Sequence, residues 1–421
     1  MRPHWARRGC ALAVSAFGLV LTVPAAGAPP PALPGCERLV TSPGFDRDGK
    51  AFCFGVDYAR AAAAVRVYAT SDHARTWKRL ETAGLPETAT RIVDAVISPL
   101  FPSDGLVVAQ FDDTVYYSVD SGVSFKAAPV RGPVALATAA APVPGLPAAP
   151  VPALNDHGVI VAPGAPGGAA GSLLFDPTLA TVRLIGGTGA RDRRFAVSPR
   201  HHLDGVAFAV GAVAGESAFT AVDQLFGCDA AFTCRAQLAR FPAGQAVDRI
   251  WFPADYEKSR VLFATTIEPG RRTLRVFASR NGGASFTPLT VLQRAVTELQ
   301  RLGVQPAVAV TGGRQGSRTV YARVSGGTQA ANPPSERLYR SDDDGTSWRL
   351  VSYGRLPTVK APRGTMPYAY AYAATDARPT PLGLLTFAGG RLLMTGGRWS
   401  PLGYVVWCST NGGTRWAAAC P

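Results

Sequence analysis

Ser341-Asp342-Asp343-Asp344-Gly345-Thr346-Ser347-Trp348 is the stretch of sequence that decides the fold. It is one of five copies of a phrase that reads S-x-D-x-G-x-T-W, and the other copies span 70–77, 118–125, 279–286 and 409–416. Asp or Asn at the third place can accept hydrogen bonds from nearby backbone N–H groups, and Gly at the fifth tolerates positive φ. The closing aromatic can pack under the turn. Such long-range self-similarity is the signature of an array or a propeller, so we expect repeated hairpins.

The phrase resembles the Asp-box, or BNR repeat, of sialidase-like and sortilin-like β-propellers, and the chain is also similar to propellers related to photosystem II assembly and stability factors. This chain departs from the pattern at Ala74 (for Gly), Arg415 (for Thr or Ser), and Asn281 and Asn411 (for Asp), where we expect looser turns. The resemblance implies a structural box between the third and fourth strands of a blade, on the face opposite the ligand site. The structural positions are then Asp72, Trp77, Asp120, Phe125, Asn281, Phe286, Asp343, Trp348, Asn411 and Trp416.

A second phrase, Ser-Pro followed shortly by Asp-Gly, begins at Ser42, Ser98 and Ser198, with a worn copy from Phe252 to Phe263. Apolar runs flank it, which predicts strand, turn and strand, and the box hairpin then adds a third and a fourth strand. Four strands make a propeller blade. We therefore expect an all-β fold, a seven-bladed β-propeller of four-stranded antiparallel blades. The blades lie near 36–85, 86–130, 131–190, 191–243, 244–296, 297–353 and 354–421.

A six-bladed ring is the alternative, in which residues 127–157, within a stretch rich in Ala, Pro and Gly, form a disordered insertion. The unit 191–243 has no box, and Cys228 and Cys234 stand where the box is expected. We expect a disulfide clasp to replace the hydrogen-bonded turn there.

The N-terminus has the pattern of a secretory signal peptide over residues 1–28: Arg2, Arg7 and Arg8, then an apolar run over 11–23, then small residues. A Pro-rich linker over 29–35 and a single propeller domain over 36–421 follow. We expect a secreted or extracytoplasmic protein with no integral membrane segment after cleavage. Lipid anchoring at Cys36 is the alternative.

Six cysteines remain once Cys10 leaves with the signal peptide. An even number in an oxidising compartment indicates disulfides, although six cysteines allow about fifteen connectivities. The local spacing favours three short-range pairs, Cys36 with Cys53, Cys228 with Cys234, and Cys408 with Cys420.

The formal charge of +14 falls to +11 when the three arginines of the signal peptide are removed. The remaining charges are scattered and form no Lys/Arg run, so we expect a basic, soluble surface and no nucleic-acid binding. A basic surface also suits acidic partners. We expect a monomer whose partner is a glycan or a protein, with anionic partners as the leading candidates.

Loops on the face away from the boxes are the places where a propeller carries function. Arginine binds carboxylate or sulfate in bidentate fashion, and aromatic rings give flat apolar contact. The three tyrosines 368, 370 and 372 alternate with Ala, which an inner strand with one buried face explains equally well. The predicted ligand-binding residues are Tyr58, Arg60, Arg271, Arg272, Arg398, Trp399, Tyr368, Tyr370 and Tyr372.

A sialidase of the resembled family needs three arginines, a Tyr paired with a Glu, an Asp acid/base, and an Arg-Ile-Pro triplet before the first box. This chain has no such triplet, and no metal-ligand spacing or phosphate-binding Gly loop is found in the sequence. We therefore assign no catalytic residue, metal or cofactor, and lean against an enzyme. The expected function is an exported binding or scaffold module. The alternative is a sialidase-like or other glycoside hydrolase with carboxylates about 5 to 10 Å apart in a central pocket.

Overall fold

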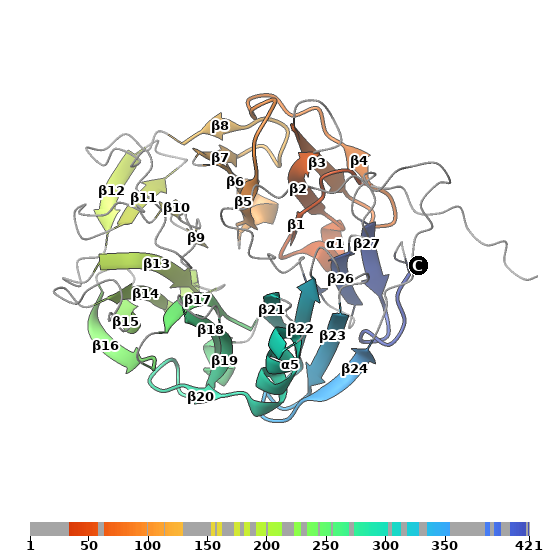
Figure 1. The fold of residues 1–421 in the computed structure, drawn as a ribbon. Helices are drawn as coiled ribbons and strands as arrows, with labels where there is room; N and C mark the ends of the chain where they lie inside the picture. Colours follow the sequence, from red (N-terminus) through yellow and green to blue (C-terminus); the bar gives the residue numbers. More distant parts are fainter. Residues whose placement is uncertain are drawn as a thin grey trace, which may run out of the picture.

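The computed structural model describes residues 33–57, 63–98, 100–112 and 114–128 and, with gaps in the loops, 153–353, 384–396 and 405–420. The predicted signal peptide lies outside these residues. The described strands form antiparallel sheets arranged around a ring, as Figure 1 shows. Strands that follow one another in the sequence pair with one another, so each sheet comes from one continuous segment.

Seven sheets are described, six with four strands and one with three. The first sheet contains β1 (Arg38–Thr41), β2 (Ala51–Asp57), β3 (Ala64–Thr70) and β4 (Lys78–Arg79). The second contains β5 (Ile92–Ile97), β6 (Val107–Phe111), β7 (Thr114–Ser118) and β8 (Lys126–Ala127). The third contains β9 (Ala153–Asn155), β10 (Gly158–Val161), β11 (Ser172–Asp176) and β12 (Thr181–Ile185). The fourth contains β13 (Arg191–Val197), β14 (Ala207–Ala212), β15 (Asp223–Cys228) and β16 (Cys234–Arg240).

The fifth sheet contains β17 (Ala246–Trp251), β18 (Leu262–Glu268), β19 (Thr273–Ser279) and β20 (Thr287–Pro288). The sixth contains β21 (Gln305–Gly312), β22 (Val320–Gly327), β23 (Ser335–Ser341) and β24 (Arg349–Tyr353). The last sheet contains β25 (Leu384–Phe387), β26 (Arg391–Gly396) and β27 (Val405–Ser409). Its outer side is continued by a single bridge between Cys408 and Ala417.

The structure thus confirms an all-β propeller of four-stranded antiparallel blades. Five blades are described in both backbone and side chains: β1–β4, β5–β8, β13–β16, β17–β20 and β21–β24. This number is smaller than the predicted seven, or six. Sheet β9–β12 is described in its backbone alone, and sheet β25–β27 lacks a full fourth strand.

Continuous apolar runs form the middle strands of the blades. All seven residues of β2 and all five of β6 are buried, as expected for strands covered by a neighbouring blade on each face. Between blades β1–β4 and β5–β8 the core is aromatic, with Phe52, Phe54, Phe101, Phe111 and Phe125 in one cluster. Packing between blades therefore supplies the hydrophobic core.

Each copy of the Ser-Pro phrase forms a short helical turn between the first and second strands. These turns are α1 (Phe45–Asp48), α2 (Phe101–Asp104) and α3 (His201–Asp204), and α4 (Tyr256–Ser259) occupies the same place in blade β17–β20. In α2, the Ser98 hydroxyl donates to Asp104 at 2.5 Å and Gly105 ends the turn with φ 62°. Ser42 and Ser198 make the same bond, each at 2.6 Å. The phrase is therefore a hydrogen-bonded unit.

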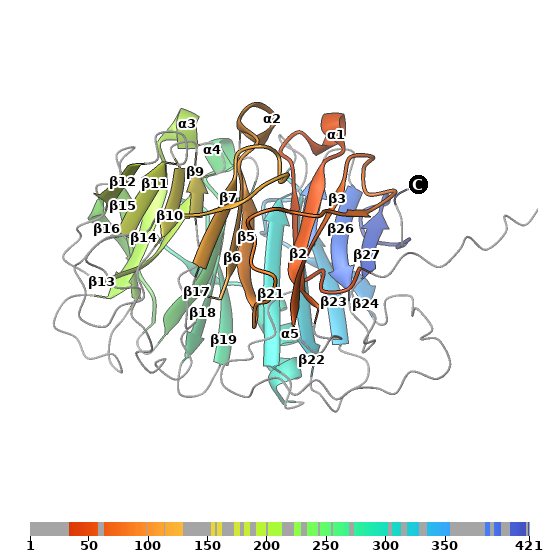
Figure 2. The ribbon, with the colours of Figure 1, turned by 90° about the horizontal axis from the view of Figure 1, so that it is seen from above.

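The helix α5 (Thr290–Arg301) was not predicted. It lies at the face of the ring opposite α1–α4, as Figure 2 shows. Leu292, Ala295, Val296 and Leu299 are buried against strands of blades β17–β20 and β21–β24. Their i, i+3, i+4, i+7 spacing is the sequence signal of this helix. Among the described residues, no helix is long and apolar enough to cross a membrane.

The five repeated phrases form the turns that follow the third strand of their sheets, and we call them the repeat turns (70–77, 118–125, 279–286, 341–348 and 409–416). In the turn 341–348, the Ser341 hydroxyl donates to Asp343 at 2.7 Å and accepts from the Gly345 N–H at 2.8 Å. Asp343 also accepts from the Ser347 N–H at 2.8 Å. The repeat turn rests on the preceding turn of its own blade, since the Asp344 N–H donates to the Arg318 carbonyl at 3.0 Å.

The closing aromatics do more than pack under their own turns. The Trp348 indole N–H donates to the Gly345 carbonyl at 3.0 Å, while its ring meets Phe263 of the neighbouring blade β17–β20 edge to face. Phe125 meets Phe54 of blade β1–β4 in the same way. Phe125 is buried, whereas Trp348 is half-buried. The repeat turns therefore join neighbouring blades.

The predicted pairs Cys36–Cys53 and Cys408–Cys420 are confirmed as disulfides. All four cysteines lie in one buried cluster with Leu393 and Val406, where the first sheet meets the last. Cys228 is also disulfide-bonded, and its register partner is Cys234, whose side chain lies outside the described residues. The third pair stays a prediction.

Candidate functional site

The predicted ligand-binding residues all lie outside the part of the chain that the structure describes: Tyr58, Arg60, Arg271, Arg272, Arg398, Trp399, Tyr368, Tyr370 and Tyr372. The structural positions of the repeat turns, by contrast, lie in the part of the chain that the structure describes. A candidate site must therefore be built from other residues.

The first strand of each sheet lies nearest the middle of the ring, as β1, β5, β17 and β21 show in Figure 1. Three charged side chains on these strands form a cluster that we call the central cluster: Arg38 on β1, Asp94 on β5 and Arg249 on β17. A nitrogen of Arg38 lies 3.8 Å from one carboxylate oxygen of Asp94. A nitrogen of Arg249 lies 3.6 Å from the other.

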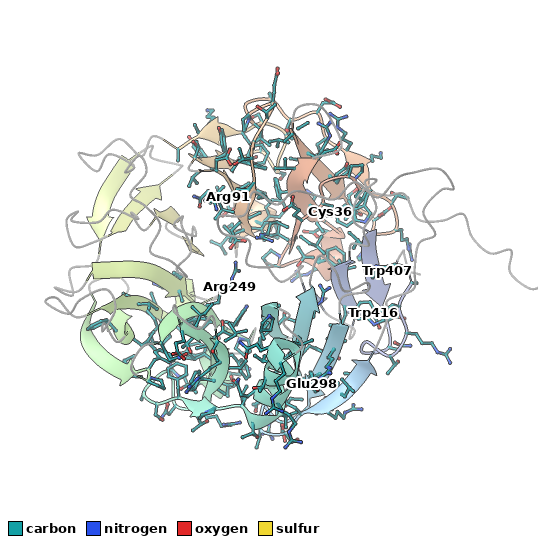
Figure 3. The ribbon with its side chains drawn as sticks, viewed as in Figure 1. Cys36, Arg91, Arg249, Glu298, Trp407 and Trp416 are labelled. Atoms are coloured by element: carbon teal, nitrogen blue, oxygen red, sulfur yellow. A yellow bond between two sulfur atoms is a disulfide. The ribbon has the colours of Figure 1, made fainter. Side chains whose placement is uncertain are left out.

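Arg249 reaches its partner across the ring. Its strand, β17, belongs to a blade that is not adjacent to β1 or β5 in the sheet order, and Figure 3 shows the side chain extending into the middle of the ring. The Asp94 and Arg38 side chains are 12% and 11% exposed, whereas Arg249 is 29% exposed. Arg249 is thus the member of the cluster that a solute can reach.

Two β-bulges aim these side chains. On β5 the register with β6 shifts between Ile92 and Asp94, and on β17 the register with β18 shifts between Val247 and Arg249. Strand β13 has the same irregularity between Asp192 and Arg194. A bulge turns a side chain away from the regular alternation and is common beside functional sites. The bulges explain how charged residues inside apolar strands point to the middle of the ring.

The bulge on β5 also frees a carbonyl group. Arg38 donates to the Val93 carbonyl from Nε at 3.3 Å and from Nη2 at 3.1 Å. Arg38 is therefore fixed by the backbone, and its charge is brought close to Asp94. The two ion-pair distances exceed those of good hydrogen bonds, which are about 2.7 to 3.2 Å. Two arginines against one carboxylate leave the central cluster with a positive formal charge.

A carboxylate clamp holds the segment before β5. Asp112, at φ 48°, accepts hydrogen bonds from the backbone N–H groups of Thr90 and Arg91, each at 3.1 Å, and from the Thr90 hydroxyl. Its own N–H donates to the Arg91 carbonyl at 3.1 Å. Arg91 immediately precedes β5 in the chain. Asp112 therefore positions backbone near the central cluster.

Further titratable groups lie on blade β1–β4: Glu37, which is half-buried by its exposed surface, and the buried pair Asp57 and Arg66. The Glu37 carboxylate accepts from the Val56 N–H at 3.3 Å, and burial raises its pKa from 4.5 to about 7, although Arg38 and that N–H group oppose the rise. Asp57 and Arg66 form an ion pair at 3.6 Å, with side chains 10% and 7% exposed. Within the described residues, no group of three or more His, Cys, Asp and Glu is suited to hold a metal ion.

Sequence reasoning missed Arg38, Asp94 and Arg249. The sequence feature that could have indicated them is a charged residue inside an apolar strand, as in Ile92-Val93-Asp94-Ala95-Val96-Ile97. A charged side chain in such a run is rarely buried without a partner. The sequence does not show that the partners come from strands so far apart in the chain.

No protein-family profile matches the sequence, and no curated protein matches it. Solved structures are similar at low identity. A GH74 xyloglucanase from Xanthomonas campestris is 14% identical, with a TM-score of 0.39 over 90% of this chain and 45% of that chain. An ancestral GH74 enzyme is 12% identical, with a TM-score of 0.48 over 92% and 46%. A prolyl endopeptidase is 13% identical, with a TM-score of 0.39 over 74% and 41%. The chain spans less than half the length of these structures, and likeness at this level carries no conclusion about chemistry.

Proposed function

We propose that this protein is an extracytoplasmic binding module of the Asp-box propeller type, and that it binds an anionic group of a glycan or an acidic protein at the central cluster. The hydrogen-bonding pattern of the repeat turns supports the Asp-box assignment. We also propose a ring of seven blades, counting sheets β9–β12 and β25–β27. The two disulfides support a location outside the cytoplasm.

The observation that carries the binding role is the pairing of one carboxylate with two arginines. Asp94 is held between Arg38 and Arg249, so it is poorly placed to act as a free acid or base. Arg249 is partly exposed, and within the described residues it forms this ion pair and no hydrogen bond. Its guanidinium N–H groups can therefore turn to a carboxylate or sulfate of a ligand, which arginine binds in bidentate fashion.

The test is the affinity for a heparin-derived hexasaccharide, measured by isothermal titration in low salt. We expect Arg249→Ala to weaken binding about tenfold, as the loss of one charge-assisted hydrogen bond implies. Arg275→Ala is the matched control, because Arg275 is exposed on β19 of the same blade. Equal weakening by both variants would show diffuse attraction to a basic surface and would refute a central site.

Glycoside hydrolysis is the second candidate function, and Glu37 is the observation that favours it. A carboxyl group whose pKa is raised to about 7 is about half protonated at neutral pH, and its protonated form can serve as a general acid. Hydrolysis of polysaccharides by the purified protein, abolished by Glu37→Gln, would support this candidate over the binding module. Activity that survives Glu37→Gln would exclude Glu37 as the acid.

A further inference from the structure

A groove lies between the blades β1–β4 and β5–β8, and residues of two repeat turns line it. It encloses about 300 Å³, and its walls are the turn 70–77 with strand β4 on one side and the turn 118–125 on the other. Phe52, Leu80 and Val123 give it apolar lining, and Lys50, Lys78 and Glu81 give it charge. None of these residues belongs to the central cluster.

The charge of the groove is positive. Lys78 is exposed, and the Lys50 ammonium lies 5.7 Å from the centre of the Phe101 ring, which holds it at the groove without neutralising it. The carboxylate of Glu81 lies 3.7 Å from Arg79, which offsets its charge. The carboxylates of the two repeat turns point into the turns, where backbone N–H groups and hydroxyls donate to them. The groove therefore attracts a negatively charged group.

The repeat turn at the groove has apolar side chains that its own fold does not require. Val119 and Val123 are 49% and 68% exposed, the highest values among the large apolar side chains of the described residues. They occupy the second and sixth places of the phrase. In the other copies these places hold small, polar or charged residues, namely Ser71, Arg75, Arg280, Ala284, Asp342, Thr346, Thr410 and Thr414. Four turns form without a large apolar residue there, and Val123 is the member of this pair that lines the groove.

We propose that this groove is a docking site for an extended acidic segment of a partner protein. An aliphatic side chain of that segment packs on Val123 and Leu80, and a flanking carboxylate binds Lys50 and Lys78. A peptide supplies both groups within a few residues. A sulfated glycan supplies the negative charge without an aliphatic side chain, so the exposed Val123 favours the peptide.

The test uses fluorescence anisotropy with a labelled peptide of alternating glutamate and leucine. We expect Lys78→Glu and Val123→Ser each to weaken binding about tenfold or more. The control for charge is Lys126→Glu, since Lys126 begins β8 as Lys78 begins β4 but does not line the groove. The control for apolar contact is Val291→Ser, which removes another exposed valine, on α5. Both controls should bind as the unaltered protein does.

Several outcomes would overturn the proposal. The proposal is wrong if the peptide does not bind, if Lys78→Glu and Lys126→Glu weaken peptide binding equally, or if Val123→Ser leaves peptide binding unchanged. Competition by the heparin hexasaccharide with no preference for the peptide would assign the groove to glycans instead. Arg249→Ala should leave peptide binding unchanged, so failure at this groove and failure of the central cluster are distinguished.

Discussion

The third residue of each repeat turn plays the same part whether it is Asp or Asn. The side-chain oxygen of Asn281 accepts from the Ser285 N–H at 2.9 Å, and that of Asn411 accepts from the Arg415 N–H at 2.9 Å. Asp72 and Asp120 accept from the equivalent N–H groups at the same distance. The looser turns expected at the two Asn positions are therefore not seen in these bonds.

We predict that Asp343 contributes to stability in a way that depends on pH. Hydrogen bonds from the Ser347 hydroxyl, the Ser347 N–H and the Ser341 hydroxyl lower its pKa from 3.8 to about 2. Because the folded-state pKa is the lower one, the contribution is complete above pH 3.8 and is lost as the pH falls towards 2. In Asp343→Asn, the melting temperature should fall less steeply between pH 4 and pH 2. An unchanged slope would contradict the prediction.

We predict that the contribution of Glu37 to stability depends on pH in the opposite direction from that of Asp343. Its pKa is raised from 4.5 to about 7, chiefly by burial, so the folded state is favoured below pH 4.5 and loses this advantage as the pH rises through 7. Glu37→Gln keeps an acceptor for the Val56 N–H and cannot ionise. We expect its melting temperature to vary less between pH 4.5 and pH 8 than that of the unaltered protein. Thermal melts across this range provide the measurement. Parallel curves of melting temperature against pH for the two proteins would refute the prediction.

At the scale of elements, glycine at the fifth place of a repeat turn touches the neighbouring blade. A Cβ atom on Gly345 would lie 2.7 Å from the Phe263 ring, and one on Gly413 would lie 2.4 Å from a methyl of Leu338. Ala74 occupies the same place in the first blade, and it is buried in the cluster where the first and last sheets meet. There the extra methyl group fills space between blades.

We predict that Gly345→Ala destabilises the protein more than Gly282→Ala. Both glycines have positive φ, 78° and 69°, so both variants suffer backbone strain. A Cβ on Gly282 would meet nothing closer than 3.6 Å, whereas the one on Gly345 collides with Phe263. We expect the difference in unfolding free energy to be about 1 to 3 kcal/mol, the usual cost of overpacking. Equal losses in denaturant unfolding would show that the contact between blades contributes nothing.

The sequence predicts the hairpins well because each turn is local. The residues that make the bonds of turn 341–348 all lie within eight positions of one another. The bulges beside Asp94 and Arg249 are not predictable in this way, because a one-residue shift leaves the apolar pattern of the strand intact. The cluster itself joins β1, β5 and β17, and no periodicity in the sequence links those strands.

At the scale of the whole molecule, side-chain packing joins the first sheet to the last. Each described sheet is built from consecutive strands, and among the described strands none of the first sheet pairs with one of the last. The junction instead consists of one apolar cluster that includes Leu39, Tyr68, Leu393 and Val406 together with both described disulfides. Trp407 and Trp416 lie in this last part of the ring in Figure 3.

We predict that the Cys408–Cys420 disulfide stabilises the closed ring. It fixes the segment after β27, whose Ala417 exchanges two backbone hydrogen bonds with Cys408. Replacing both cysteines by serine should lower the unfolding free energy by about 2 to 4 kcal/mol. Denaturant unfolding of the double variant, with the reduced unaltered protein for comparison, gives the measurement. If the double variant is as stable as the oxidised protein, the side-chain packing between the first and last sheets is sufficient to close the ring without the disulfide.

The manner of closure also sets an order of events while the chain is being synthesised. Blade β1–β4 is complete early, but the apolar side formed by Leu39, Tyr68 and Ala74 finds its partners Leu393 and Val406 only when the far end of the chain has been made. Until then that side is exposed to water and to other nascent chains. The apolar side of the first blade is therefore a surface at which an open ring can associate with other chains, and the closed ring covers it.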